Sequence, residues 1–191
     1  MIFQHFLLKV ELAIGEVNAH IFGCDETKEV MMIDAGKYDP RFAEFVEDNG
    51  LNLTTIFITH DHRDHVEGVH ECAERFGAQV IAGTENPGGY PADRVVAHGD
   101  EVQIGRLTAK VVSTPGHTPV GLSLIFPGMI FSGDALFAGA VGGTASPENY
   151  QTQHDTVEKH LLTLPDHYEI HSGHGPATTV RNERLHNPFF T

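Results

Sequence analysis

The sequence has few cysteines and no long apolar run, and each shortage excludes a class of protein. Its two cysteines, Cys24 and Cys72, form no C-x-x-C motif, so we expect neither a disulfide framework nor a thiolate zinc site. Both are expected to be small buried apolar residues. No apolar run approaches the roughly 20 residues of a membrane span. The first residues have no basic run before their apolar stretch and no small-residue cleavage site, so we expect no secretory signal and a cytoplasmic location.

Positive charge is also scarce. Lys and Arg together number 12 against 26 Asp and Glu, which gives a formal net charge of −14. An acidic surface repels phosphate groups, so we expect no nucleic-acid partner, and without a span no membrane partner. A length of 191 residues, of which 40% are hydrophobic, fits a single domain over residues 1–191 with a substantial core. The oligomeric state does not follow from the sequence.

Alternating apolar positions predict strands, and apolar positions at helical spacing predict helices. We expect strands at 3–12, 18–23, 29–34, 53–59, 78–82, 101–104, 107–113, 122–126, 129–131 and 168–171. We expect helices at 40–49, 64–76, 149–164 and 178–186, and a Gly/Ala-rich loop at 138–146. Strands with helices interspersed in both halves of the chain predict two packed sheets with helices outside them.

Histidine is abundant, with 14 residues. Three of them lie within residues 60–65, directly after the predicted strand 53–59. Residues 59–65 read T-H-D-H-R-D-H. Alternate side chains of an extended loop point the same way, so His60 and His62 can grip one metal ion. Asp64 and His65 then begin a helix, where they can face a second ion. An acidic residue in the first helical turn also complements the helix dipole.

Three further motifs each follow a predicted strand, and each offers one more ligand. Their candidate ligands are His117 in T-P-G-H-T, Asp134 in F-S-G-D and His174 in S-G-H-G. Proline and glycine favour tight turns that would present these side chains rigidly. Any one of the three is weak evidence alone. Together they place every candidate ligand at the C-terminal end of a strand, as a shared site requires.

These motifs, in this order over nearly the whole chain, resemble the metallo-β-lactamase superfamily in its glyoxalase II-like (hydroxyacylglutathione hydrolase-like) branch. The segment Ile33–Gly36, and the tail residues 173–179 with Glu183 and Asn187–Phe189, also resemble that branch. The resemblance implies an α/β fold, an αββα sandwich of two mixed β-sheets flanked by helices. It implies two divalent metal ions, the first held by His60, His62 and His117, the second by Asp64, His65 and His174, with Asp134 bridging them.

Nitrogen and oxygen ligands without thiolate suit zinc, and also iron or manganese. We expect a metal-dependent hydrolase in which a metal-bridging hydroxide attacks a thioester carbonyl. Asp64 is the predicted catalytic residue, which orients the hydroxide and takes its proton. Asp34 is the candidate that fixes a ligand histidine by a hydrogen bond, although a strand-end Asp can equally cap a turn. We expect no residues for any other cofactor.

The resemblance implies a small-molecule thioester of the S-lactoylglutathione type as substrate. Only 17 residues follow His174 (191 − 174), so we expect no separate C-terminal helical substrate domain, which full-length glyoxalase II carries. The loop after Asp134 also lacks the arginine and the acidic residues commonly found there. A thioester other than that of glutathione therefore remains open.

Two alternatives use the same ligands. The first is a persulfide dioxygenase, which resembles the same branch and uses one iron and O₂. The second is a metal-stabilised non-catalytic module. A β-lactamase is less expected, because such enzymes lack a bridging Asp at the position of Asp134. The remaining histidines are assigned no role, and Arg181 and Arg184 fit either an anionic substrate or a solvated helix face.

Overall fold

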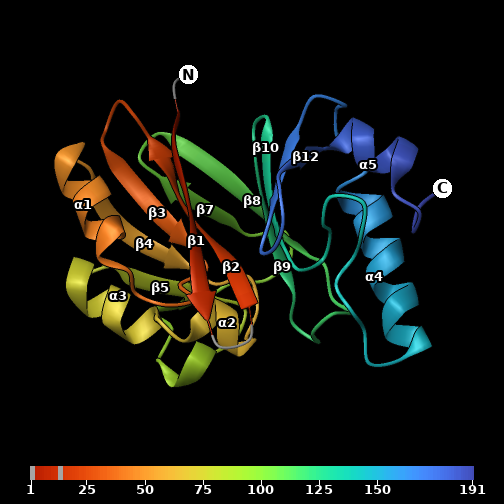
Figure 1. Cartoon of the computed structure of the whole chain (residues 1–191), viewed down its shortest axis with the longest axis horizontal. Helices are drawn as coiled ribbons and strands as arrows, with labels where there is room; N and C mark the ends of the chain where they lie inside the picture. The colour runs from red at the N-terminus through yellow and green to blue at the C-terminus, as the bar shows by residue number, and fades with distance from the viewer. Residues whose placement is uncertain (1–2, 13–14) are drawn as a thin grey trace. The chain divides into compact units, whose positions relative to one another are not determined.

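The computed structural model describes residues 3–12 and 15–191, and the chain forms two compact units (Figure 1). Unit 1 comprises the chain up to Val96 together with Val102–Thr108, and unit 2 comprises Ala97–Glu101 and Ala109–Thr191. The chain passes from one unit to the other after Val96, after Glu101 and after Thr108. The prediction of a single domain over residues 1–191 stays a prediction.

Unit 1 is built on a six-stranded sheet with the strands in sequence order. The strands are β1 (Phe3–Leu12), β2 (Gly15–Cys24), β3 (Glu29–Ile33), β4 (Asn52–Phe57), β5 (Gln79–Ala82) and β6 (Arg94–Val95). The first three are antiparallel, and β3 to β6 are parallel to one another. Parallel pairing brings the C-terminal ends of β3, β4 and β5 to one edge of the sheet, where the loops that carry candidate ligands begin.

The helices of unit 1 are α1 (Pro40–Asp48), α2 (Arg63–Val66) and α3 (Val69–Phe76), with a 3-10 turn η1 (Pro87–Gly89). Asp39 caps α1 by accepting a hydrogen bond from the backbone N–H of Arg41 at 2.9 Å, and Pro40 occupies the first helical position. Figure 1 shows α1 and α3 along one face of the sheet. Phe42 of α1 and Cys72 of α3 are fully buried in the core on that face.

Unit 2 holds most of a second mixed sheet, in the order β12-β11-β10-β9-β8-β7. Its strands are β7 (Glu101–Ile104), β8 (Leu107–Ser113), β9 (Leu122–Phe126), β10 (Met129–Gly133), β11 (Glu169–Ser172) and β12 (Thr178–Thr179). Its helices are α4 (Pro147–His160) and α5 (Val180–His186). Val157 of α4 and Val180 of α5 pack with Ile130 and Ile170 of the sheet in a second core. Two mixed sheets flanked by helices, as predicted, are therefore confirmed.

The predicted helix 64–76 is wrong as a single element, because two short helices replace it. The break falls at Gly68, whose backbone N–H donates to the carbonyl of Ala35 at 2.8 Å. A Cβ atom on Gly68 would lie 2.7 Å from the backbone of Lys37 and Tyr38. The close approach of the loop after β3 thus interrupts the helix, a tertiary contact that the periodicity of the sequence does not reveal.

Other boundaries differ by a few residues. The predicted helix 149–164 begins at Pro147, because Ser146 caps it by accepting from the N–H of Asn149, and it ends at His160. The predicted strand 29–34 ends at Ile33, because Asp34 has a left-handed φ of 58°. The short strands β6 and β12 and the turn η1 were not predicted.

Both cysteines are free and buried, as predicted. Burial raises the pKa of the Cys72 thiol to about 12, so this side chain stays neutral and behaves as an apolar core residue. Among the described residues, no helix has both the length and the apolar character that a bilayer crossing requires. The cytoplasmic location stays a prediction.

Replacing Gly68 with alanine tests the close approach that divides the predicted helix. We expect Gly68→Ala to lower the free energy of unfolding by about 1–3 kcal/mol, because the added methyl group must displace backbone rather than a flexible side chain. Urea denaturation followed by circular dichroism measures the change. Gly143→Ala is the matched control, since nothing lies within 4 Å of its added Cβ. Equal stability of Gly68→Ala and the wild type would contradict the packing described.

Candidate metal centre

The first set of candidate ligands lies in unit 1, on the loop after β4 and at the start of α2. His60 is buried, and its ring centroid lies 4.9 Å from that of His62 and 4.1 Å from that of His65. His60 offers a nitrogen within 4.8 Å of one on each of those two rings. Asp64 is half-buried, with Oδ2 3.9 Å from Nε2 of His65. All four predicted ligands of the first motif are thus gathered in one small region of unit 1.

Beneath these ligands lies the buried carboxylate of Asp34, at the end of β3. It accepts three hydrogen bonds of 2.8 Å, from the backbone N–H of Thr59, from its hydroxyl and from Nδ1 of His65. The left-handed φ of Asp34 turns the chain sharply away from β3 while its N–H still donates to the carbonyl of Phe57. Left-handed backbone outside glycine is tolerated best by Asp and Asn, and it is typical of functional sites.

This network fixes which nitrogen of each ring carries the proton. Nδ1 of His65 donates to the Asp34 carboxylate, so the neutral ring presents the lone pair of Nε2. The single hydroxyl hydrogen of Thr59 is used on Asp34, so the 3.0 Å contact to His60 requires Nδ1 of His60 to donate. His60 therefore also presents Nε2 as its lone pair. One carboxylate sets two imidazoles in the tautomer that a metal ion needs.

The second set of candidate ligands lies in unit 2, where three loops converge on Asp134. The Oδ2 atom of this buried carboxylate lies 3.5 Å from Nε2 of His117 and 3.4 Å from Nε2 of His174. Gly133, with a φ of 52°, turns the chain at the end of β10, where the pairing with β11 shifts by one residue. The N–H of Gly173 donates to the carbonyl of Gly133, which ties the Asp134 loop to the His174 loop.

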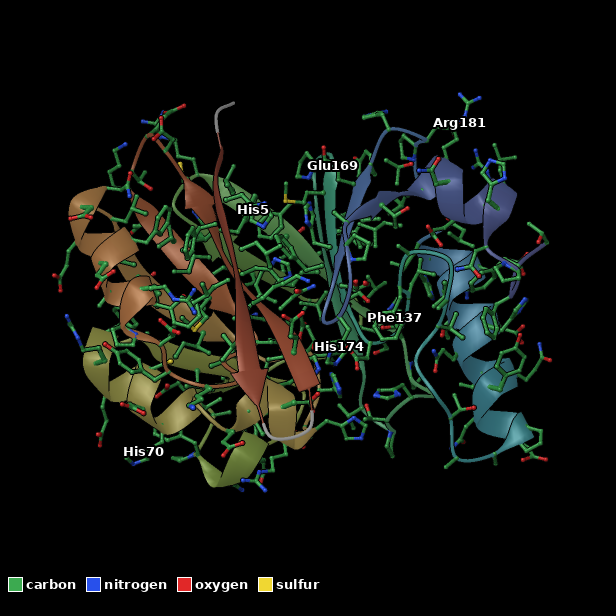
Figure 2. The ribbon with its side chains drawn as sticks, in the orientation of Figure 1. His5, His70, Phe137, Glu169, His174 and Arg181 are labelled. Atoms are coloured by element: carbon green, nitrogen blue, oxygen red, sulfur yellow. The ribbon has the colours of Figure 1, made fainter. Side chains whose placement is uncertain are left out.

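Two neighbours orient these rings. Nδ1 of His117 donates to the backbone carbonyl of Gly143 at 2.6 Å, which leaves its Nε2 lone pair facing Asp134. The ring of Phe137 stands edge-on to His174 with centroids 5.9 Å apart, and Figure 2 shows both labelled side chains. Three of the five predicted histidine ligands therefore donate a hydrogen bond from Nδ1 to a protein oxygen: His60, His65 and His117. A donor set of Nε2 lone pairs and carboxylates fits divalent zinc, iron or manganese.

Gln153 is a site residue that sequence reasoning missed. It is fully buried on α4, and its Nε2 donates to the carbonyls of Ala135, at 3.0 Å, and Gly142, at 3.1 Å. These two carbonyls belong to the residue after Asp134 and the residue before Gly143, the partner of His117. One amide therefore joins the backbone segments that position two candidate ligands. The only signal in the sequence is a polar residue on the buried face of a helix.

The sequence assigned no role to Thr59, which begins the motif of residues 59–65. Its hydroxyl links Asp34 to His60. The tail motif also has a structural explanation. The buried carboxylate of Glu183 accepts from the N–H of Gly139 at 2.9 Å, and the side chain of Asn187 donates to the carbonyl of Ala140. Both therefore anchor the loop that follows Asp134.

The two arginines of α5, Arg181 and Arg184, differ in their contacts. The guanidinium of Arg184 pairs with Asp166 and also donates to the carbonyl of Leu162, so a structural contact accounts for it. Arg181 is exposed, and Figure 2 shows it on the outer side of α5. Nothing in the contacts of either residue points to a substrate.

Comparison with known proteins identifies the family. Residues 14–174 match the model of the metallo-beta-lactamase superfamily. The chain is 31% identical to a hydroxyacylglutathione hydrolase of Haemophilus ducreyi over 169 residues, which cover 88% of this chain and 70% of that protein. It is 39% identical to another of Bradyrhizobium sp. over 146 residues, which cover 74% of this chain but 56% of that protein. The chain thus spans little more than half the length of this second relative.

Solved structures agree with the family match. A B3 metallo-beta-lactamase, BLEG-1, superposes with a TM-score of 0.89 at 26% identity, over 98% of this chain and all of that one. ETHE1 from Myxococcus xanthus superposes with a TM-score of 0.84 at 29% identity, over 96% of this chain and 83% of that one. The predicted fold class is therefore confirmed, and the chain belongs to the glyoxalase II-like branch of the metallo-beta-lactamase superfamily.

Proposed function

We propose that this protein is a metal-dependent hydrolase with a dinuclear site, and that it cleaves a thioester of the hydroxyacylglutathione type. The observation that carries the proposal is the common orientation of His60, His65 and His117, each held through Nδ1 by a protein oxygen so that Nε2 is presented. Purely structural histidines need no such shared tautomer. The hydroxyacylglutathione hydrolases among the relatives supply the substrate class.

In this proposal the ligand sets of the two units act together. His60, His62 and His117 would hold one ion, Asp64, His65 and His174 would hold the other, and Asp134 would serve both. The assignment follows the superfamily to which the chain belongs, and the geometry within each unit supports it. In unit 2, Nε2 atoms of two rings converge on one oxygen of Asp134, as expected around a shared ligand.

When bound, such ions would supply Lewis acidity and a water acidic enough to react near neutral pH. The residues of the chain do the rest. Asp64 is half-buried in the first turn of α2, where its carboxylate orients the attacking water and accepts its proton at an Oδ atom. Asp34 keeps the proton of His65 at Nδ1 by accepting its hydrogen bond. It does the same for His60 through the hydroxyl of Thr59, which donates to Asp34 and accepts from Nδ1 of His60. We propose zinc as the metal and a small-molecule thioester as the substrate of the protein.

The second candidate function is that of a persulfide dioxygenase with a single iron. The likeness to ETHE1 from Myxococcus xanthus, at 29% identity over 96% of this chain, is the observation that favours keeping it. The two candidates differ in the metal that they need, and only the dioxygenase consumes O₂, whereas the hydrolase consumes water. Iron as the sole bound metal, with oxygen uptake on glutathione persulfide, would support the dioxygenase.

Turnover of S-lactoylglutathione by the purified protein tests the proposed function. We expect thioester cleavage at a rate above background, together with two divalent ions per chain by elemental analysis. Chelation should abolish the activity and zinc should restore it. His62→Ala removes an exposed candidate ligand with little effect on packing, and its activity is expected to fall to background. A metal-free protein, or a His62→Ala variant as active as the wild type, would overturn the proposal.

Asp34→Asn tests how the ligand histidines are oriented. An amide N–H placed against Nδ1 of His65 forces that ring into the tautomer without a lone pair at Nε2, so we expect zinc affinity to fall about 10–100-fold. Thr59→Val should also weaken binding, because it removes the hydroxyl that accepts from His60 and donates to Asp34. Chelator competition measures each affinity. Asp61→Asn is the matched control in the same loop. Among the described residues, the side chain of Asp61 accepts hydrogen bonds from Thr84 alone. Equal losses in Asp61→Asn and Asp34→Asn would refute the orienting role.

Gln153→Leu tests whether α4 positions the ligands of unit 2. The change leaves the carbonyls of Ala135 and Gly142 without their shared donor, so we expect zinc affinity to fall roughly tenfold in protein that is still folded. Gln151→Leu on the same helix is the control, because Gln151 is exposed and its side chain hydrogen-bonds Asp155 alone among the residues that the structure describes. If Gln153→Leu lowers thermal stability but binds zinc as tightly as the wild type, the role of Gln153 is structural only.

A further inference from the structure

A cavity of about 550 Å³ lies in unit 1, away from the residues assigned to the metal ions. This volume is within the usual range for small-molecule sites. Its walls come from the β1–β2 hairpin and from the loop between β3 and α1. The lining residues are Lys9, Val10, Glu16, Lys37, Tyr38, Asp39, Pro40 and Arg41.

The cavity concentrates positive charge in an acidic protein. Three of the chain's 12 Lys and Arg residues line it, against two carboxylates. A net charge of −14 repels an anionic substrate, so a site that accepts one needs cations close by. The cavity is therefore a place in unit 1 where an anionic group can bind despite the negative net charge of the protein.

Two of the three cations are already paired. Lys9 contacts Glu16 at 3.2 Å, and Arg41 forms two hydrogen bonds to Asp39, of 2.9 and 2.7 Å. Lys37 is exposed and forms no ion pair within 4 Å with the described side chains, those of residues 5–10 and 16–191. Its charge reaches Asp39 only at longer range, where it adds to the larger effect of Arg41 in lowering the pKa of that carboxyl. The Lys37 ammonium is thus available to a ligand.

The chain also links Lys37 to the candidate metal ligands of unit 1. Gly36, the preceding residue, packs so tightly on Asp64 that a Cβ there would lie 2.2 Å from the Asp64 carbonyl oxygen. The backbone of Lys37 itself packs against Gly68. The loop that supplies Asp34 to the ligand network therefore continues directly into the wall of the cavity. The cavity and the candidate ligands of unit 1 are thus connected through one short stretch of backbone, residues 34–37.

We propose that this cavity binds the carboxylate-bearing end of the substrate's thiol part, with Lys37 as its cation. The inference rests on the proposed thioesterase function and adds the chemistry of the leaving group. Interspersed cations and carboxylates suit an amino acid zwitterion, whose ammonium group can approach Glu16 or Asp39, better than a phosphate. Peptide-like thiols such as glutathione carry this group, so the cavity would recognise them with residues of unit 1.

Kinetics with two thioesters test the inference. Lys37→Ala should raise KM for S-lactoylglutathione about two- to fivefold, as expected for one exposed ion pair, and leave kcat unchanged. KM for the uncharged S-lactoyl-N-acetylcysteamine should stay at the wild-type value. Lys110→Ala is the matched control, because it removes one exposed positive charge on β8 and changes the net charge equally. Equal shifts in the two variants, or for the two thioesters, would overturn the inference.

Binding of S-hexylglutathione, a thioether that cannot be hydrolysed, separates this inference from the proposed function. Calorimetric titration should show weaker binding to Lys37→Ala than to Lys110→Ala. If the wild type cleaves no thioester but binds S-hexylglutathione in a Lys37-dependent manner, the hydrolase proposal fails and the cavity assignment stands. If it cleaves thioesters but binds S-hexylglutathione equally well in both variants, the cavity assignment fails and the hydrolase proposal stands.

Discussion

The hydrogen bonds of the buried Asp34 carboxylate are the interaction on which the candidate centre of unit 1 depends. A buried carboxylate is stable only when it is well bonded, and Asp34 meets this need with donors from Thr59 and His65. The same bonds join the end of β3 to the loop after β4 and to α2. The requirement to satisfy one buried charge therefore also orients the imidazoles, so folding and ligand presentation have the same cause in this half of the chain.

Unit 2 reaches a similar result by other means. Its ligands stand on separate loops after β8, β10 and β11, and a backbone carbonyl, that of Gly143, rather than a carboxylate receives the Nδ1 proton of His117. Buried polar side chains on the two helices then secure these loops. Gln153 from α4 joins two carbonyls beside the ligands, and Glu183 from α5 holds the N–H of Gly139. The helices of unit 2 thus contribute polar anchors as well as apolar packing.

The sequence predicted the features that local spacing controls. The run of residues 59–65 indicated four candidate ligands on one loop and the start of the next helix, and the strands around it were placed within a few residues. Features that depend on contacts between distant segments were beyond reach. The helix break at Gly68 arises from the approach of the loop after β3, and the role of Gln153 arises from carbonyls 11 and 18 residues away. Neither contact leaves a periodic or compositional trace in the sequence.

The bond between His117 and the carbonyl of Gly143 has a consequence for how the protein can change over time. A backbone oxygen is present whatever residue occupies the position, so no single codon change at 143 can delete this acceptor. The acceptors for His60 and His65 are side chains, which one substitution can remove. Among descendants of this sequence, one substitution can therefore remove the acceptor that orients His60 or His65, whereas the acceptor of His117 persists and is lost only when the loop that carries it moves.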